Sequence, residues 1–166
     1  MSKTHETILR KYQQLPNRLE TAILGLSDAQ LDLTLGKDWS IREYVHHTVE
    51  GELMWQLFLR AILGTDGIEI PIQWYFAITQ DEWAKRWVSG KRAVGPTLAL
   101  FHGSTASLVE LLRNVPSAAW EHSGHVTWPG NDKETHLTVR DIVLIHLRHM
   151  DGHTADIRAI REYHGV

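Results

Sequence analysis

The sequence predicts an all-α protein, a four-helix bundle with one long crossover loop. Four long segments carry apolar residues at helical spacing, and turn-forming residues separate them. Bundles of this kind build their ligand sites from side chains on facing helices. The 166 residues suit one domain over 1–166, and the apolar fraction of 43% is enough for a buried core.

Composition excludes several classes of function. The chain has no cysteine, so disulfides, thiolate zinc sites and a cysteine nucleophile are all ruled out. No secretory leader and no membrane-spanning segment is evident, and we expect a cytoplasmic protein. The net charge of −3 gives no electrostatic reason to bind nucleic acid. We therefore expect a small molecule as partner, and neither nucleic acid nor a membrane.

The N-terminal part predicts one helix and one helical turn. Apolar positions at helical spacing run from about Thr4 to Leu24, and Pro16 within this span predicts a kink or a break. A short helical turn is expected over 28–33.

The second helix has the clearest boundaries. Ser40 is a good N-cap, and Glu43 three residues later completes a capping box. Trp39, just before the cap, can pack onto the first turns. The helix is expected to end at Gly64.

The middle of the chain predicts a connection over 65–78 and a third helical region from about Gln80. Gly90, Gly95 and Pro96 are expected to break that region, and a further helix follows over about 97–112.

Residues 117–137 predict a long loop, with a small hairpin around 126–128 and 135–137. The last helix is expected to begin after Thr138, which has Asp141 three residues later, and to run to about Tyr163. Arg42 is expected to pair with acidic neighbours, and the tryptophans to serve mainly as core residues.

The last helix carries the most informative pattern. His149 and His153 are four residues apart, so both point to the same side of a helix and can reach one metal ion. His146 lies three residues earlier on the same apolar stripe. Buried imidazoles are costly unless their nitrogens are satisfied, and a metal ion satisfies them.

A third histidine comes from the second helix. His46 and His47 are adjacent there, and adjacent helical residues diverge by about 100°, so only one can face the same ion. The apolar neighbours Val49 and Met54 favour His47. Three neutral histidines leave a coordination position open, as in catalytic zinc sites.

The histidine pattern also has an interpretation without metal binding. An isolated histidine pair at helical spacing is more often surface or core filler than a ligand pair. The remaining histidines are expected to be mostly exposed or in loops; they are His5, His102, His122, His125, His136 and His164.

Two segments together resemble the DinB-like superfamily, and within it the YfiT-like metal-dependent hydrolases. They are WSIREYVHHTVEGE (39–52) and LTVRDIVLIHLRHMDGH (137–153). The resemblance implies a four-helix bundle with a three-histidine metal site, and carried over by position the ligands are His47, His149 and His153. Glu50 departs from the family pattern, where aspartate is common.

The resemblance leaves the reaction open. Members include enzymes that add bacillithiol or mycothiol to electrophiles and a thiol-dependent maleylpyruvate isomerase, so a low-molecular-weight thiol is a candidate second cofactor beside one zinc or nickel ion. The leading hypothesis is a metal-dependent enzyme, as a thiol S-transferase or a hydrolase. The alternative is a non-catalytic metal- or stress-ligand-binding module. A homodimer is expected, since relatives often dimerise.

No catalytic residue follows from the sequence, but several neighbours of the site do. Glu50 and His146 are candidates for groups that support the ligands. Three residues of the loop over 117–137 could close over a substrate: Trp120, His122 and Trp128.

Overall fold

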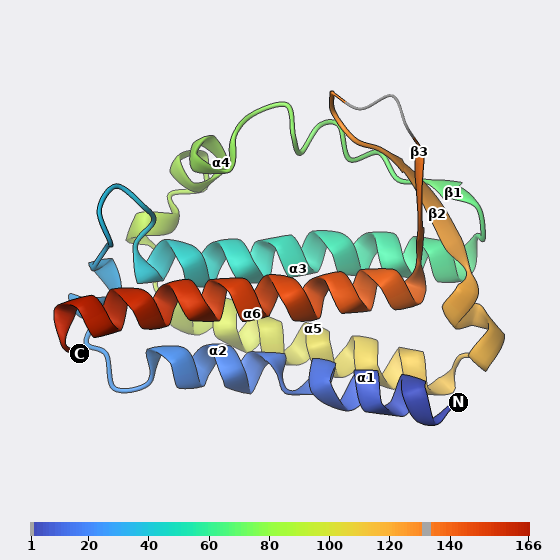
Figure 1. Ribbon diagram of the computed structural model, residues 1–166, viewed down its shortest axis with the longest axis horizontal. Coiled ribbons are helices and arrows are strands. Elements are labelled where there is room, and N and C mark those ends of the chain that lie inside the picture. The colour runs from blue at the N-terminus through green and yellow to red at the C-terminus, as the bar shows by residue number, and fades with distance from the viewer. Residues whose placement is uncertain (1, 131–133) are drawn as a thin grey trace.

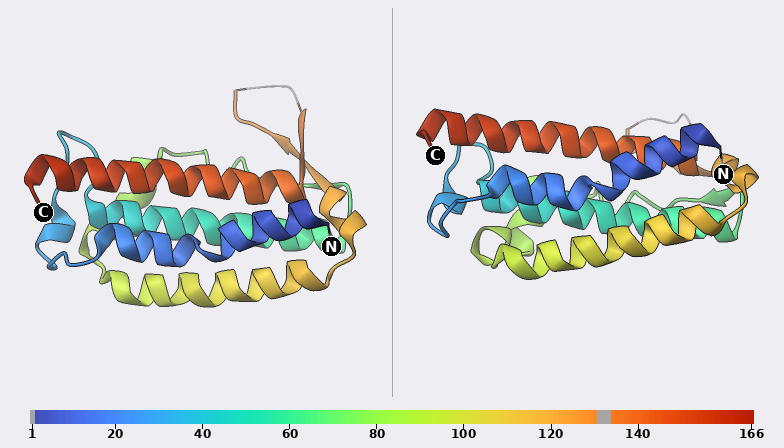
Figure 2. Two further views of the ribbon diagram at one scale, coloured as in Figure 1. Left: turned by 60° about the horizontal axis from the view of Figure 1, so that its bottom comes forward. Right: turned by 90° about the horizontal axis from the view of Figure 1, so that it is seen from below.

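A computed structural model describes residues 2–130 and 134–166 and contains four helical rods packed side by side (Figures 1 and 2). The rods are α1 (Lys3–Gln13) with α2 (Leu15–Ile23), then α3 (Ile41–Gly64), α5 (Val94–Asn114) and α6 (Val139–His164). Helix α3 packs against both α5 and α6, and the α1–α2 rod closes the opposite side against the same two helices. The predicted all-α bundle is confirmed.

The first rod is broken rather than continuous. Helix α1 ends at Gln13, and Pro16 occupies the first turn of α2. Proline has no N–H to bond to the preceding turn, so the first helix stops and a new one begins. Of the kink and the break that Pro16 predicts, the structure has the break.

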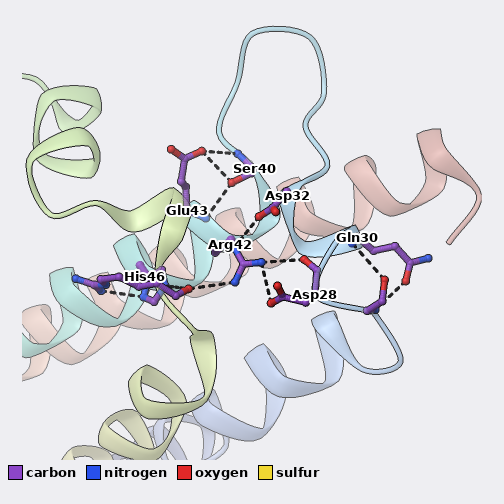
Figure 3. A network of polar contacts seen from close by, with 9 residues as sticks. Asp28, Gln30, Asp32, Ser40, Arg42, Glu43 and His46 are labelled. Carbon is purple, nitrogen blue, oxygen red and sulfur yellow. Dashed lines mark hydrogen bonds and ion pairs between the residues drawn. The ribbon is translucent and has the colours of Figure 1, made fainter.

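Helix α3 is fixed at its beginning by the predicted capping box. The Glu43 backbone N–H donates to Ser40 Oγ at 3.3 Å, and the Ser40 N–H donates to Glu43 Oε2 at 2.9 Å. Arg42, which lies between these two residues, is 4% exposed and donates to Asp32 at 2.6 Å and to Asp28 Oδ1 at 2.9 Å (Figure 3). These contacts hold the 3₁₀ turn Gln30–Asp32 against α3. Arg42 pairs with acidic neighbours as expected.

The crossover is the segment 65–93, which returns along the bundle so that α3 and α5 run in the same direction (Figure 1). It contains β1 (Ile68–Glu69), α4 (Gln80–Arg86) and a 3₁₀ turn (Ser89–Lys91). The predicted break at Gly95 and Pro96 is wrong, because α5 already begins at Val94. Pro96 fits there because backbone N–H groups in a first helical turn have no helical partner.

A three-stranded sheet lies at one end of the bundle. After the 3₁₀ helix Ser117–Glu121, strands β2 (Ser123–Thr127) and β3 (Glu134–Thr138) form the expected antiparallel hairpin. Strand β1 adds to it in parallel, with Ile68 opposite Gly124. A Cβ atom at Gly124 would lie 3.0 Å from the Ile68 carbonyl oxygen, so the close approach of the strands favours glycine there.

The core contains apolar side chains from every rod, together with a few polar ones. His5, expected among the exposed or loop histidines, is instead 9% exposed, and its ring stacks on Trp120 with the centroids 4.3 Å apart. Among the described residues, no helix has the length and apolar character that crossing a membrane requires.

Candidate metal centre

The structure brings three histidines of two facing helices together. His47 comes from α3, and His149 and His153 come from successive turns of α6. The Nε2 atoms of His47 and His149 are 3.3 Å apart, and those of His149 and His153 are 3.0 Å apart. One ring nitrogen from each residue lies within 4.8 Å of the other two. Three nitrogen donors therefore converge on one point between the helices.

This spacing fits a divalent ion. Zn–N bonds of 2.0–2.1 Å in tetrahedral geometry place neighbouring nitrogens about 3.3 Å apart, close to the separations of the Nε2 atoms here. His153 Nδ1 lies 3.1 Å from Asp156 Oδ2, a contact that favours the proton on Nδ1 and leaves Nε2 with its lone pair.

Burial keeps two of these imidazoles neutral. Desolvation, reinforced by the two neighbouring histidines, lowers the pKa of His47 to about 3. Desolvation and His153 likewise lower the pKa of His149 to about 4. Metal ligation requires the unprotonated ring. Both side chains therefore have the protonation state of a ligand over the whole physiological range.

Aromatic side chains cover the cluster near the beginning of α3. Trp39 packs edge-on to His47, with ring centroids 4.5 Å apart, and its Nε1–H donates to Asp81 of α4 at 2.7 Å. Tyr44 lies against His153 at 5.3 Å. Trp39 therefore packs onto the second turn of α3, as its position before the cap suggested, and also ties α4 to this end of the site.

His46 has a different environment from His47. Its Nε2 lies 3.2 Å from the Arg92 carbonyl oxygen, and its Nδ1 lies 2.9 Å from both the Arg92 guanidinium and Thr97 Oγ1. The Arg92 guanidinium also binds Glu50, at 2.5 Å. Burial raises the pKa of Glu50 and Arg92 opposes that rise. Both Glu50 and His46 therefore belong to a polar network around Arg92.

A cavity of about 270 Å³ opens beside the histidine cluster. Helices α3 and α6 supply its floor, and the crossover and the segment after β2 supply aromatic side chains; the lining residues are His47, Gly51, Trp55, Tyr75, Phe76, Gln80, Trp128, Ile145, His146 and His149. None of them is an aspartate, glutamate, lysine or arginine. A Cβ atom at Gly51 would lie 3.5 Å from His149 Cε1, so the absence of a side chain there keeps the cavity open next to the cluster.

The three loop residues proposed to close over a substrate have different positions. Trp128 lines the cavity, and its ring lies 5.8 Å from Phe76. Trp120 is fully buried against His5, and His122 is outside the residues that line the cavity. Sequence reasoning missed Tyr75 and Phe76, which lie on a connection without periodic pattern.

His146 lines the cavity and is not one of the three converging donors. Its Nδ1 lies 2.8 Å from Glu52 Oε1 of α3, a close contact that does not have hydrogen-bond geometry. Glu52 was also missed from the sequence, although a glutamate five residues after His47 on a core-facing helix is an identifiable signal.

A second group of possible ligands lies on the hairpin. His125 Nδ1 is 2.8 Å from Glu134 Oε1, and His136 Nε2 is 3.8 Å from the same oxygen. These three side chains lie at the end of the molecule that carries the sheet, on strands β2 and β3.

Comparison with known proteins places the chain in a family. The sequence model of the DinB superfamily matches residues 11–157. The chain belongs to the DinB superfamily. It is 30% identical over 154 residues to a Geobacillus kaustophilus protein, with 91% of this chain and 80% of that protein covered, and 26% identical over 155 residues to one from Geobacillus thermodenitrificans, covering 92% and 82%. Both relatives are named "Putative metal-dependent hydrolase".

The fold comparison agrees with this DinB membership. YfiT from Bacillus subtilis, described as a probable metal-dependent hydrolase with an unusual four-helix bundle topology, superimposes with a TM-score of 0.85 at 19% identity. The match covers 99% of this chain and 90% of YfiT. The resemblance to YfiT-like proteins found in the sequence is thus confirmed for the fold.

Proposed function

We propose that this protein is a metal-dependent hydrolase that acts on a small uncharged molecule with an apolar body. The observation that carries the proposal is the convergence of three histidine nitrogens beside a cavity of about 270 Å³. His47, His149 and His153 would hold one zinc or nickel ion. When bound, such an ion supplies Lewis-acid polarisation and lowers the pKa of a water molecule. The names of the two Geobacillus relatives support the same reaction class.

The cavity suggests the substrate class. Small-molecule sites are mostly apolar with a few placed polar groups, and here Trp55, Phe76 and Trp128 supply the apolar wall. The lining has no charged carboxylate or ammonium group to pair with an ionic substrate. Aryl and short alkyl esters, lactones and amides therefore fit better than phosphorylated compounds.

The test is turnover of such a panel by zinc- and nickel-loaded protein, with and without chelator. We expect ester or amide hydrolysis that chelation abolishes while the far-ultraviolet circular dichroism of the bundle persists. Thiol transfer with bacillithiol, mycothiol or glutathione is the other reaction to screen. Collapse of the helices on chelation without any turnover would favour the non-catalytic alternative, a structural ion.

A substitution of Gly51 tests the cavity itself. Gly51→Leu would fill the space beside His149, so we expect the metal to be retained and turnover to be lost. Gly103→Leu is the matched control, because this exposed glycine of α5 has open space around it. Full turnover by Gly51→Leu would rule out this cavity as the substrate site.

We also propose that residues 1–166 act as one domain that pairs with a second copy. Light scattering of the purified protein tests this, and a monomer at high concentration would contradict it.

A further inference from the structure

The centre of the bundle contains a chain of buried polar side chains. Tyr12 of α1, Glu52 and Gln56 of α3, and His146 of α6 are each at most 4% exposed. The Tyr12 hydroxyl donates to Glu52 Oε1, and Gln56 Nε2 donates to the Tyr12 oxygen at 3.2 Å. Burial and the adjacent carboxylate raise the pKa of Tyr12, so its hydroxyl stays protonated and remains a donor. Apolar residues would pack here without the desolvation cost that this network carries.

The network ends at His146. Glu52 Oε1 already accepts the Tyr12 hydroxyl, so its 2.8 Å contact with His146 Nδ1 is attractive only when Nδ1 carries the proton. Nε2 of the same ring then has a free lone pair. Among the described residues, no group hydrogen-bonds to this Nε2, although the side chain is 2% exposed. A buried polar atom without a partner calls for a specific explanation.

The position of His146 supplies that explanation. Its ring lines the same cavity as His47 and His149, one helical turn before His149 on α6. Trp55 borders the ring edge-on, with centroids 6.4 Å apart. A molecule bound in this cavity would lie beside the His146 ring, whose buried Nε2 lacks a hydrogen-bond partner.

We propose that His146 Nε2 is the general base of the hydrolysis and that Glu52 is its positioning residue; this rests on the proposed function. A water oxygen bonds to the acyl carbon of the substrate while its proton moves to Nε2. The bond from that carbon to the leaving oxygen or nitrogen then breaks, and the proton passes from Nε2 to the leaving atom. The sum is the addition of one water across one bond, without oxidant or reductant.

The first test measures the His146 tautomer by nitrogen-15 NMR of the zinc-loaded protein labelled at histidine. We expect the proton on Nδ1 in the wild type. In Glu52→Gln, which keeps the side-chain volume, the new amide can donate to Nδ1, and we expect the proton to move to Nε2. Glu20→Gln is the matched control, because it removes a carboxylate 2.9 Å from the half-exposed His102 and leaves His146 unaffected. A proton on Nε2 in the wild type, or the same tautomer in Glu52→Gln, would overturn the positioning role.

The second test measures turnover of the best substrate from the panel. His146→Gln should lower kcat by about 100-fold, with zinc content and KM nearly unchanged, and Glu52→Gln should cause a smaller loss. His102→Gln should retain full turnover, and thermal melts check that every variant is folded. Full kcat in His146→Gln would overturn the base role and leave the hydrolase proposal intact. A wild-type protein without any turnover would overturn both the base role and the hydrolase proposal. The tautomer of His146 reports separately on its contact with Glu52.

Discussion

Within residues 2–130 and 134–166, two groups of side chains each bring three possible metal ligands within 4.8 Å of one another, and the groups differ in what holds them. One group, the helical cluster, consists of His47, His149 and His153. The other, the hairpin cluster, consists of His125, Glu134 and His136. The helical cluster stands on two long packed helices, each with a capping box at its beginning. The hairpin cluster stands on two five-residue strands.

The two clusters also differ in which partners satisfy their imidazole nitrogens. In the hairpin cluster, the Glu134 carboxylate already lies against both histidines, and the side chains of Glu134 and His136 are 53% and 63% exposed. Water and the carboxylate can therefore satisfy the imidazoles. In the helical cluster, three half-buried nitrogens face one another without an acid between them. Proximity of possible ligands alone is thus a weak criterion for a metal site. Nitrogen donors that face one another on rigidly packed helices are a stronger criterion.

The largest expected difference is in metal affinity. His149→Ala removes one of three nitrogen donors and should weaken zinc binding by about 100-fold, since a structural zinc ion contributes roughly 10–16 kcal/mol shared over its ligands. The matched variant His136→Ala should leave the affinity within about twofold. Isothermal titration calorimetry measures both. An equal loss in the two variants would remove the distinction between the clusters.

The pH dependence of stability should come next in size. The pKa values of His47 and His149, about 3 and 4 when folded, lie below their ordinary unfolded value of about 6.5. The unfolded chain therefore binds more protons between these values, and stability falls as pH decreases through 6.5. Metal-free protein should lose about 2 kcal/mol of unfolding free energy between pH 7.5 and 5.5.

Urea titration at the two pH values measures this loss. The double variant His47→Asn with His149→Asn is the control, and it should lose much less stability over the same interval. A flat profile in the wild type would show that the helical cluster is as hydrated as the hairpin cluster.

Removing the carboxylate beside the helical cluster should have a smaller effect on metal affinity. Asp156→Asn removes the carboxylate that orients His153 through Nδ1, and partners of this kind change metal affinity by about 10-fold to 100-fold. We expect a value near the lower end because the Asp156 side chain is 48% exposed. Glu134→Gln, the corresponding change beside His125, should not alter zinc binding at the helical cluster.

The smallest expected effect comes from removing the helix cap of α3, which tests how the scaffold supports the site. Ser40→Ala removes the cap of α3 and should cost about 1 kcal/mol of unfolding free energy, with zinc affinity almost unchanged. Chemical denaturation of the zinc-free protein measures the cost. A large loss of zinc affinity in this variant would show that the beginning of α3 positions His47 more directly than the capping contacts suggest.

Much of the bundle could be predicted because its signals are local. Capping boxes and helical spacing placed α3 and α6 closely, and the divergence of adjacent helical residues separated His47 from His46. The contacts that were missed join distant segments. A two-residue strand such as β1 has no pattern of its own, and the partnership of Glu52 with His146 depends on how α3 packs against α6.

The pairing of β1 with β2 has a consequence for redesign. It joins the crossover, which supplies Tyr75 and Phe76, to the hairpin segment that leads to Trp128. Apart from Trp55 of α3, the aromatic wall of the cavity is thus carried by two segments outside the four rods, and these can be exchanged together. Exchanging residues 65–80 and 122–138 together with those of a DinB relative would carry both halves of the wall and their shared strand register. Such a chimaera should change which molecules bind in the cavity, while the histidines of α3 and α6 keep their positions.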